Sequence, residues 1–276
     1  LGYFKLQVLM FDDYQQMANS NRVKLKPTMP ARGVIYDRNG VLLADNVSAY
    51  RMELIPEQVK DIDQTLLQLG EIVALSKDDL NRFRRAKDNS RKFLPIAVKL
   101  RLSEDEVARF AVNRFRFPGV EVTPYLTRRY IYGDLFAHVF GYVARLDEQD
   151  LKALGDERYS VLTHTGKTGI ERAYEEQLRG TIGYEEVETN ARGRSLGVLK
   201  RHVSLAGTDL RLSIDLNLQK ATADAFGDFT GSAVAVDPKT GEVLAMVSLP
   251  SFDTNLFING ISTTDYVALS TDPSQP

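Results

Sequence analysis

Two Lys-Thr-Gly triplets, Lys167–Gly169 and Lys239–Gly241, are the residues of this 276-residue sequence whose types and spacing best suit catalysis. Such a triplet serves serine acyl transfer, in which a Ser-x-x-Lys pair supplies the nucleophile and its base. No serine here has a lysine three residues later, and no Ser-x-Asn occurs; only two residues follow Ser274, so its spacing cannot be tested. We therefore expect neither triplet to be catalytic, and no catalytic residue in this chain.

Metal and nucleotide sites are also not expected. The three histidines, His138, His164 and His202, are scattered and share no helix face with a carboxylate at ligand spacing. Gly166-Lys167-Thr168 imitates the end of a phosphate-binding loop, but Val161 stands where that loop needs a glycine. We predict no cofactor.

Acidic residues gather between Thr181 and Thr189, where apolar and charged residues alternate as in a strand. Glu186 and Glu188 would share one face of that strand, and a pair of glycosidase carboxylates is the catalytic alternative for them. The structural interpretation is favoured: an extended arm whose acidic edge resists unwanted pairing.

The composition is that of a globular protein, because 43% hydrophobic and 26% charged residues exclude a disordered or fibrous chain. A net charge of −2 and a pI near 6.0 provide no basic field for a phosphate backbone, so we expect no nucleic-acid partner. Without cysteine the chain has neither disulfides nor thiolate metal sites, and the compartment stays undecided.

The segment from Gly166 to Arg194 is the one around which the rest is arranged. Thr168 is a suitable N-cap with Glu171 as its capping-box partner, and apolar residues at helical spacing lead to Gly180. The outer face would pair Arg172 with Glu176 and Glu175 with Arg179. We predict one amphipathic helix, then the arm, then a turn over residues 190–194.

This segment resembles the membrane-proximal part of class B penicillin-binding proteins, above all the elongation-type penicillin-binding protein 2. Those proteins carry G-x-T-G-I-E-x-x-Y-E-x-x-L-x-G followed by G-Y-E-E-V-E-x-N-x-R-G-R, and residues 166–194 match without a gap. Residues 32–40 match the R-G-x-I-x-D-R-N-G that begins the pedestal domain of the family.

The remaining pattern predicts alternating helices and strands. Asn39-Gly40 marks a hairpin within residues 33–44, and Ser103 with Glu106 is a capping box. Helices are expected at 6–19, 61–75, 76–85, 103–112, 134–140 (capped by Asp134), 148–154 and 215–226 (capped by Asp215). Strands are expected at 92–99, 119–132, 141–146 and 209–215, with a hairpin of 232–236 and 242–249 about residues 237–241. Tyrosines and arginines between Tyr125 and Tyr132 fit a protein interface and a half-buried strand equally well.

The predicted fold is α+β: an elongated pedestal domain, made of a β-hairpin body with an inserted α/β head, followed by the first strand, helix and hairpin of a penicillin-recognising transpeptidase domain. We expect a juxtamembrane helix and connector at 1–29, the pedestal at 30–206 with its head insert at about 56–160, and an incomplete transpeptidase domain at 207–276. No apolar run is long enough to span a bilayer; the apolar residues 1–11 fit either a position just outside a membrane or a plain amphipathic helix.

The resemblance implies a parent enzyme that cross-links peptidoglycan stem peptides in the periplasm, through a serine absent from these residues, and that is a target of penicillins. It also implies one preceding membrane helix in the inner membrane, a RodA-like glycan polymerase and an MreC-like scaffold as partners, and stem peptides bound by the missing part of the transpeptidase domain. A division-type class B protein and a stand-alone interaction module are the alternatives.

The residues expected to have structural or regulatory roles are those that carry the resemblance: Arg32, Gly33, Asp37, Arg38, Gly40, Gly166, Gly169, Glu171, Arg172, Glu175, Gly180, Tyr184, Glu185, Arg192 and Gly193. We expect the helix and arm of residues 166–194 to transmit partner binding in either direction between the membrane side and the transpeptidase domain, chiefly through Arg172, Glu175, Tyr184, Glu185 and Arg192. Transmission requires two arrangements that a partner favours unequally.

Overall fold

The computed structural model describes residues 23–90, 92–146, 150, 164–190 and 195–273. The chain divides into two compact units. The first contains residues 1–30 and 181–206, and the second contains residues 31–180 and 207–276. The helix expected at 6–19, most of the one at 148–154, and Arg192 and Gly193 lie outside the described residues.

The first unit contains a three-stranded antiparallel sheet of β1 (Val23–Thr28), β8 (Gly183–Thr189) and β9 (Ser195–His202). β8 lies in the middle, so the prediction that its acidic residues form an unpaired edge is wrong. The register explains the difference, because Glu185 lies opposite Lys26 on one side and Arg201 on the other. Opposite charges across strands stabilise pairing, so Glu185 is matched by a basic residue on each neighbouring strand.

The second unit is built on β3 (Leu42–Leu54), which is the longest strand in the described part of the chain. β2 (Ile35–Tyr36) and β4 (Ile96–Leu102) pair antiparallel with successive parts of β3, and β5 (Val120–Tyr130) pairs with β3 from residue 44 to residue 54. β10 (Leu210–Arg211) adds to β2 in parallel. The hairpin predicted around Asn39-Gly40 is confirmed, and Gly40 adopts the positive φ of 84° that its turn requires.

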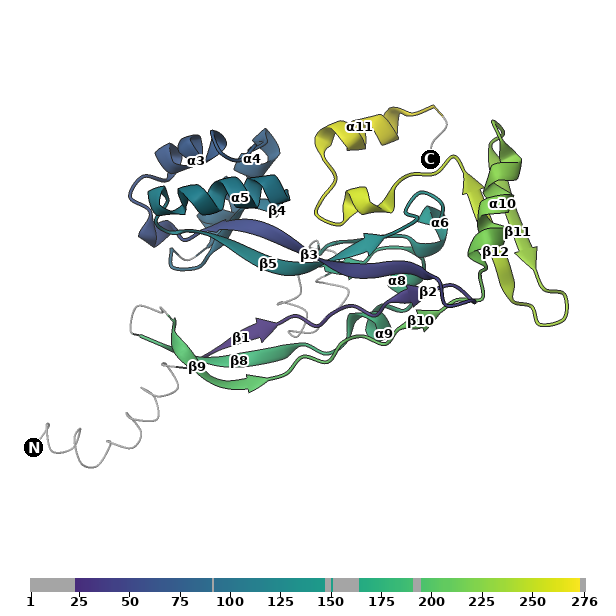
Figure 1. Cartoon of the computed structure of the whole chain (residues 1–276), viewed down its shortest axis with the longest axis horizontal. Helices are drawn as coiled ribbons and strands as arrows, with labels where there is room; N and C mark the ends of the chain where they lie inside the picture. Colours follow the sequence, from purple (N-terminus) through teal and green to yellow (C-terminus); the bar gives the residue numbers. More distant parts are fainter. Residues whose placement is uncertain (1–22, 91, 147–149, 151–163, 191–194, 274–276) are drawn as a thin grey trace, which may run out of the picture. The chain divides into compact units, whose positions relative to one another are not determined.

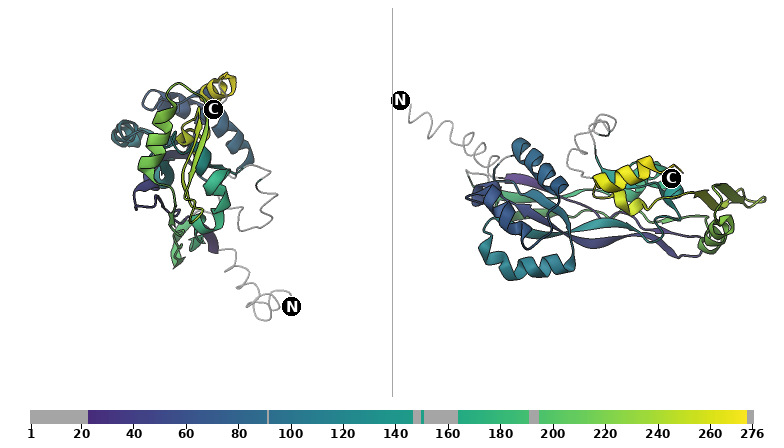
Figure 2. Two further views of the ribbon diagram at one scale, coloured as in Figure 1. Left: turned by 90° about the vertical axis from the view of Figure 1, so that its right-hand side faces the viewer. Right: turned by 90° about the horizontal axis from the view of Figure 1, so that it is seen from above.

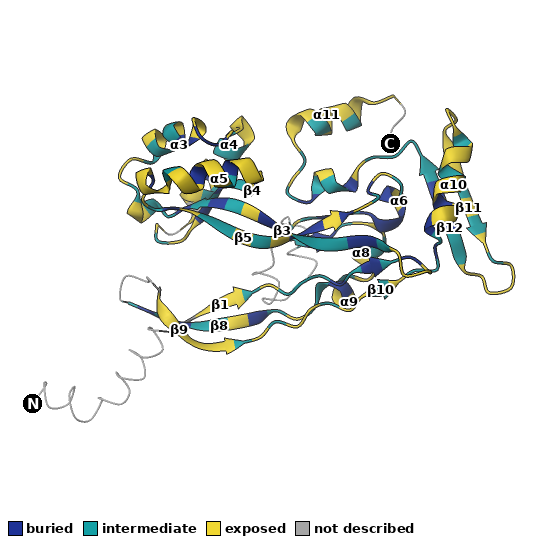
Figure 3. Cartoon of the chain, viewed as in Figure 1, coloured by how far each residue is buried: buried dark blue, intermediate teal, exposed yellow. Residues whose placement is uncertain are grey.

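Three helices cover one end of this sheet (Figure 1): α3 (Ile62–Gly70), α4 (Lys77–Asn89) and α5 (Glu104–Asn113), with short 3₁₀ turns η2 (Pro56–Gln58) and η3 (Arg114–Arg116). The capping box of Ser103 and Glu106 is confirmed. The faces that meet the sheet are buried and the outer faces are exposed (Figure 3). Their core includes Leu69, Phe83 and Phe110 against Met52 and Val98 of the sheet.

A second core lies at the other end of the sheet, around Ile35, Tyr130, Phe136, Phe140 and Leu178. It is covered by α6 (Ala137–Phe140), the strand pair β6 (Val143–Arg145) and β7 (His164–Gly166), α8 (Gly169–Ala173) and α9 (Glu175–Arg179). Asp134 does not cap α6, contrary to prediction. The N-cap is Phe136, and a carboxylate oxygen of Asp134 accepts only from the amide of Leu135.

The last elements are α10 (Leu216–Phe226), the hairpin of β11 (Gly231–Val236) and β12 (Val243–Leu249), η5 (Thr254–Phe257) and α11 (Thr263–Thr271). Asp215 caps α10 as predicted. Figure 2 shows α10 lying along the hairpin, and the amide side chain of Gln219 bonds to the backbone of Met246 at 2.7 and 2.8 Å. The α+β class is therefore confirmed.

Candidate functional site

Glu171 is the centre of a buried cluster, although it lies in the first turn of a short surface-proximal helix. Its side chain is fully buried. One carboxylate oxygen, Oε2, accepts from Nε of Arg32 at 2.7 Å, and the other, Oε1, accepts from Nε of Arg128 at 2.8 Å. A single carboxylate thus joins β5 and the segment before β2 to α8.

Arg128 and Tyr130 lie on either side of the exposed Arg129 on β5, and both hydrogen-bond to the Glu171 carboxylate. The Tyr130 hydroxyl donates to Oε1 of Glu171 at 3.1 Å and accepts from the amide of Val143. Burial, reinforced by the Glu171 charge, raises the pKa of Tyr130 well above its ordinary value, so it remains a neutral donor. Arg128 also donates from Nη1 to the carbonyl of Gly33 at 2.7 Å.

Glu175 extends the cluster to β7. Its Oε2 accepts from Nη2 of Arg32 at 2.6 Å and from the amide of Gly166 at 2.9 Å. Burial alone lowers the pKa of Arg32, but the charges of Glu171 and Glu175 outweigh it and raise that pKa. Arg32 is therefore a permanent cation held between two carboxylates.

The local helix prediction for this segment is wrong in three respects. Two short helices, α8 and α9, replace one, because Tyr174 leaves the helical region at φ −112° and ψ 25°. Thr168 makes no side-chain capping bond, and Glu171 is turned inward to the arginines instead of back to the N-cap. Glu175 likewise faces Arg32 and not the solvent; Arg172 does remain exposed.

Three glycines of the segment stand where the backbone turns or is crowded. Gly166 has no room for a side chain, because a Cβ there would lie 2.1 Å from the carbonyl oxygen of Glu171. Gly169 begins α8, and Gly180 follows α9 as its C-cap. Gly33, just before β2, is crowded as well: a Cβ there would lie 2.1 Å from the carbonyl oxygen of Thr208, and the Gly33 amide donates to the carbonyl of Leu178 at 2.7 Å.

A second cluster forms at the hairpin turn. Asp37 is 1% exposed, and its Oδ1 accepts from the amides of Asn39 and Val41 at 2.8 and 2.7 Å. Its Oδ2 accepts from the amide of Leu216, at the start of α10, at 3.3 Å. Beside it, the Asn39 side chain donates to Asp215 at 2.9 Å, and this hydrogen bond lowers the pKa of Asp215.

Arg38 supports the same joint through its backbone. Its amide donates to Ile214 at 3.0 Å, and its carbonyl accepts from Nε and Nη2 of Arg211. The exposed Arg38 side chain lies 3.7 Å from Glu242. The hairpin 35–44 is therefore tied to the residues that begin α10.

The two described arm residues lie in the first unit. Glu185 pairs with Arg201 at 2.8 Å, and the ring of Tyr184 stacks on His202 with centroids 4.1 Å apart. The sequence-predicted residues that the structure describes thus fall in three places: the cluster around Glu171, the joint around Asp37 and the arm strand β8.

Both Lys-Thr-Gly triplets take part in local structure. Lys239–Gly241 forms the turn of the β11–β12 hairpin, in which the amide of Gly241 donates to the carbonyl of Asp237. Lys167 forms an ion pair with Asp150. Among the residues that the structure describes, no three His, Asp or Glu side chains are placed to hold a metal ion.

Arg128, Tyr130 and Asn46 are residues of the site that sequence reasoning did not select. The side chain of Asn46 donates to the carbonyl of Arg32 at 2.6 Å. The alternation of tyrosine and arginine in residues 125–132 was the signal for the first two. β5 is a half-buried strand, and Arg128 and Tyr130 lie on its buried face. Arg129 lies on the other face, is exposed and pairs with Asp45.

Two family models match the chain in succession. The Penicillin-binding Protein dimerisation domain matches residues 27–212, and the Penicillin binding protein transpeptidase domain matches residues 231–276. The Asp37 joint therefore connects residues of the first match to the start of α10, which lies between the two matches.

Curated relatives extend the likeness over nearly the whole chain. The peptidoglycan D,D-transpeptidase MrdA of Escherichia coli K12 is 47% identical over 277 residues, covering 99% of this chain and 44% of that protein. MrdA of Haemophilus influenzae is 42% identical, covering 99% and 42%. The chain thus spans less than half the length of these relatives.

Solved structures of penicillin-binding proteins also match this chain. The complex of penicillin-binding protein PBP2 with MreC from Helicobacter pylori matches with a TM-score of 0.77 and 30% identity, over 92% of this chain and 48% of that one. Pseudomonas aeruginosa PBP2 in complex with WCK 5153 matches with a TM-score of 0.56 and 32% identity, over 92% and 36%. Within the described residues, no helix combines the length and apolarity needed to cross a bilayer.

Proposed function

Because the chain belongs to the class B penicillin-binding proteins, of the elongation type, we propose that residues 1–276 are the non-catalytic, partner-binding and regulatory portion of a peptidoglycan D,D-transpeptidase. The whole protein would cross-link stem peptides at the periplasmic face of the bacterial inner membrane, anchored by one N-terminal membrane helix. A serine outside these residues would attack the stem peptide, and penicillins would acylate the same serine. The chain itself is inactive in this proposal.

The observation that carries the proposal is the order of the two family matches, a dimerisation domain followed directly by the beginning of a transpeptidase domain. That order argues against a stand-alone interaction module. We assign residues 1–29 to a juxtamembrane helix and connector, 30–206 to the pedestal with a head insert at about 56–160, and 207–276 to the transpeptidase domain.

An MreC-like scaffold is the partner best supported, because a solved relative carries MreC in its complex. A RodA-like membrane glycan polymerase is the second partner, and the missing part of the transpeptidase domain would bind stem peptides. The regulatory role falls to residues 166–194. Glu171 and Glu175 hold this segment against Arg32 and Arg128, while Arg172 stays exposed and available to a partner.

The test measures glycan polymerisation by the RodA-like partner with full-length protein carrying Arg172→Ala, and separately Arg192→Ala. We expect polymerisation to fall several-fold in each variant with little change in melting temperature or penicillin labelling; for Arg172 this is because an exposed charge contributes at most about 1 kcal/mol to stability. Arg109→Ala, which removes an exposed arginine from α5, is the matched control. Wild-type polymerisation in both variants, or a loss that only follows melting, would make the segment a structural brace.

A further inference from the structure

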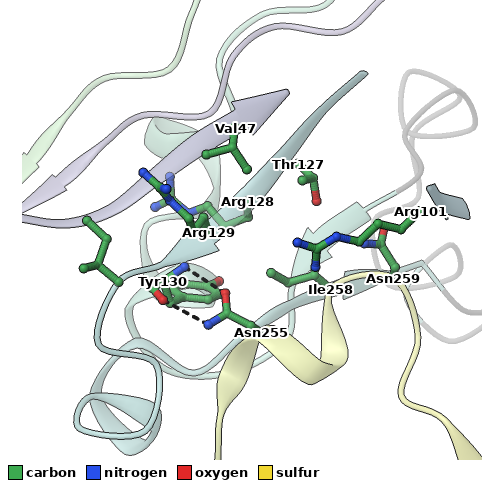
Figure 4. A pocket seen from close by; sticks show the side chains of 10 residues that line it. Val47, Arg101, Thr127, Arg128, Arg129, Tyr130, Asn255, Ile258 and Asn259 are labelled. Carbon is green, nitrogen blue, oxygen red and sulfur yellow. Dashed lines mark hydrogen bonds between the residues drawn. The ribbon is translucent and has the colours of Figure 1, made fainter. Parts of the chain in front are cut away.

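A cavity of about 460 Å³ lies between β5 and the segment 255–259 (Figure 4). Asn255 holds that segment to the strand, since its side chain accepts from the amide of Tyr130 and donates to the carbonyl of Tyr130, both at 2.9 Å. Tyr125 secures the other end by donating to Asn259 at 3.3 Å. The volume is within the range of small-ligand sites.

Two hydrogen-bond donors that line the cavity have no acceptor among the described residues. In the part of the chain that the structure describes, Arg101 forms no ion pair and the hydroxyl of Thr127 forms no hydrogen bond. Figure 4 shows the guanidinium of Arg101 and the hydroxyl of Thr127 directed into the same space. The other two arginines of the lining are neutralised, Arg128 by Glu171 and Arg129 by Asp45. Among the described residues that line this cavity, Arg101, which is itself exposed, is therefore the arginine without an ion-pair partner.

Apolar side chains complete the wall beside these donors. Val47 and Ile258 both line the cavity, and Ile258 is 4% exposed. A planar guanidinium binds a carboxylate through two parallel hydrogen bonds, and a neighbouring hydroxyl can donate a third. The combination suits a carboxylate that carries a small aliphatic group next to it.

A second cavity, of about 470 Å³, adjoins the first and shares Val47, Arg101 and Thr127 with it. Its far side is lined by Glu104 and Glu106. Glu106 is paired with Lys99 at 2.7 Å, whereas Glu104 is exposed. An acidic far side disfavours a ligand with several negative charges, so the two cavities together favour a chain with one terminal carboxylate.

We propose that these cavities form a binding site for a short peptide ending in a free carboxylate, with Arg101 and Thr127 holding the carboxylate. The identity of that peptide as a peptidoglycan stem end rests on the proposed function. The site is formed by the dimerisation-domain match on one side and the transpeptidase-domain match on the other. A bound peptide therefore stabilises the contact between β5 and segment 255–259.

The test uses full-length protein whose active-site serine is first acylated with benzylpenicillin, so that the catalytic site is closed. The probes are fluorescent L-lysyl-D-alanyl-D-alanine and its C-terminal amide, and the readout is anisotropy. We expect the free acid to bind, the amide to bind at least tenfold more weakly, and Arg101→Ala and Thr127→Val each to weaken the free acid at least fivefold. Arg109→Ala should bind as wild type does.

Equal binding of acid and amide, unchanged binding by Arg101→Ala, or an equal loss in Arg109→Ala would overturn the proposal. So would preference for a hexaglutamate peptide, which would indicate an acidic segment of a protein partner. Melting temperatures of the variants separate a binding loss from unfolding. Failure of benzylpenicillin to acylate the wild-type protein would count against the proposed function, whereas normal acylation without peptide binding overturns only the inference.

Discussion

At the scale of single residues, Glu171 shows how much one side chain contributes to the stability of the fold. Its carboxylate is fully buried and accepts from two arginines, one of which, Arg128, is itself 1% exposed. Removing one partner of a buried ion pair leaves the other charge without compensation, at a cost of roughly 3–5 kcal/mol. The cluster is therefore sensitive to the charge of Glu171 and not only to its shape.

We predict that Glu171→Gln, which keeps the shape and removes the charge, lowers the free energy of unfolding by about 3 kcal/mol or more. Urea denaturation of the chain measures this, with Glu176→Gln as control because Glu176 is exposed on the next helix. A loss below about 1 kcal/mol, or an equal loss in the control, would contradict the buried cluster.

His164 provides a pH dependence at the same scale. Burial, assisted by the nearby positive charge of Arg145, lowers its pKa from 6.5 to about 4, although the backbone of Ile258 opposes the shift. The unfolded chain therefore binds a proton more readily than the folded one. Above about pH 6.5 this histidine does not lower the free energy of unfolding. As the pH falls from about 6.5 through about 4, it lowers that free energy progressively.

We predict that His164→Gln makes the free energy of unfolding less pH-dependent between pH 7 and pH 4, by up to about 3 kcal/mol. Chemical denaturation at pH 7, 5.5 and 4.5 provides the measurement. His138→Gln is the comparison, because His138 lies on the surface beside Phe252. The same pH dependence in wild type and His164→Gln would refute the burial of a neutral imidazole.

At the scale of elements, β8 illustrates how charged residues affect the order of strands in a sheet. It carries Glu185, Glu186 and Glu188 and lies between two strands that carry lysine and arginine. Each favourable cross-strand pair contributes roughly 0.2–1 kcal/mol. The central position of β8 is therefore stabilised by its neighbours' charges, which a pattern read along one strand does not reveal.

Glu185→Lys should destabilise this sheet by about 1 kcal/mol, because it places a third cation between Lys26 and Arg201. Amide hydrogen exchange across β8 reports the change. Adding Arg201→Glu should recover part of the loss by recreating one opposite-charge pair. If the double variant exchanges faster than the single one, the pairing of Glu185 with Arg201 does not stabilise the sheet.

At the scale of the whole molecule, Asp37 links parts of the sequence 179 residues apart by accepting from Leu216. It also closes its own hairpin turn through Asn39 and Val41. A buried carboxylate that serves both purposes makes the position of α10 depend on the hairpin. Loss of this side chain would leave three backbone donors without their acceptor.

We predict that Asp37→Ala lowers the free energy of unfolding by at least about 2 kcal/mol, since each unsatisfied buried group costs about 1–3 kcal/mol. Exchange of the Leu216 amide should accelerate together with that of α10. Asp45→Ala, which breaks only the exposed pair with Arg129, should cost less than about 1 kcal/mol. Unchanged exchange at Leu216 would show that the joint does not hold α10.

The sequence by itself determined the features that depend on neighbours in the chain. The Asn39-Gly40 hairpin, the capping boxes at Ser76 and Ser103 and the Asp215 cap follow from residues within four positions of one another. Of these, the box at Ser76 was expected only as the start of a helix. The long motifs of residues 32–40 and 166–194 also determined the family, because so many fixed positions identify a lineage without any knowledge of their contacts.

Only the tertiary structure decided what those motif residues contact. Glu171 has the spacing of a capping residue, but Arg32 lies 139 residues away in the sequence and outcompetes the local partner. A capping bond contributes about 1 kcal/mol, whereas two buried arginines left without their carboxylate would cost several times more. The same reason explains the break at Tyr174, the central place of β8, and the cavity that Arg101 and Thr127 share, since each depends on segments that meet only in the folded chain.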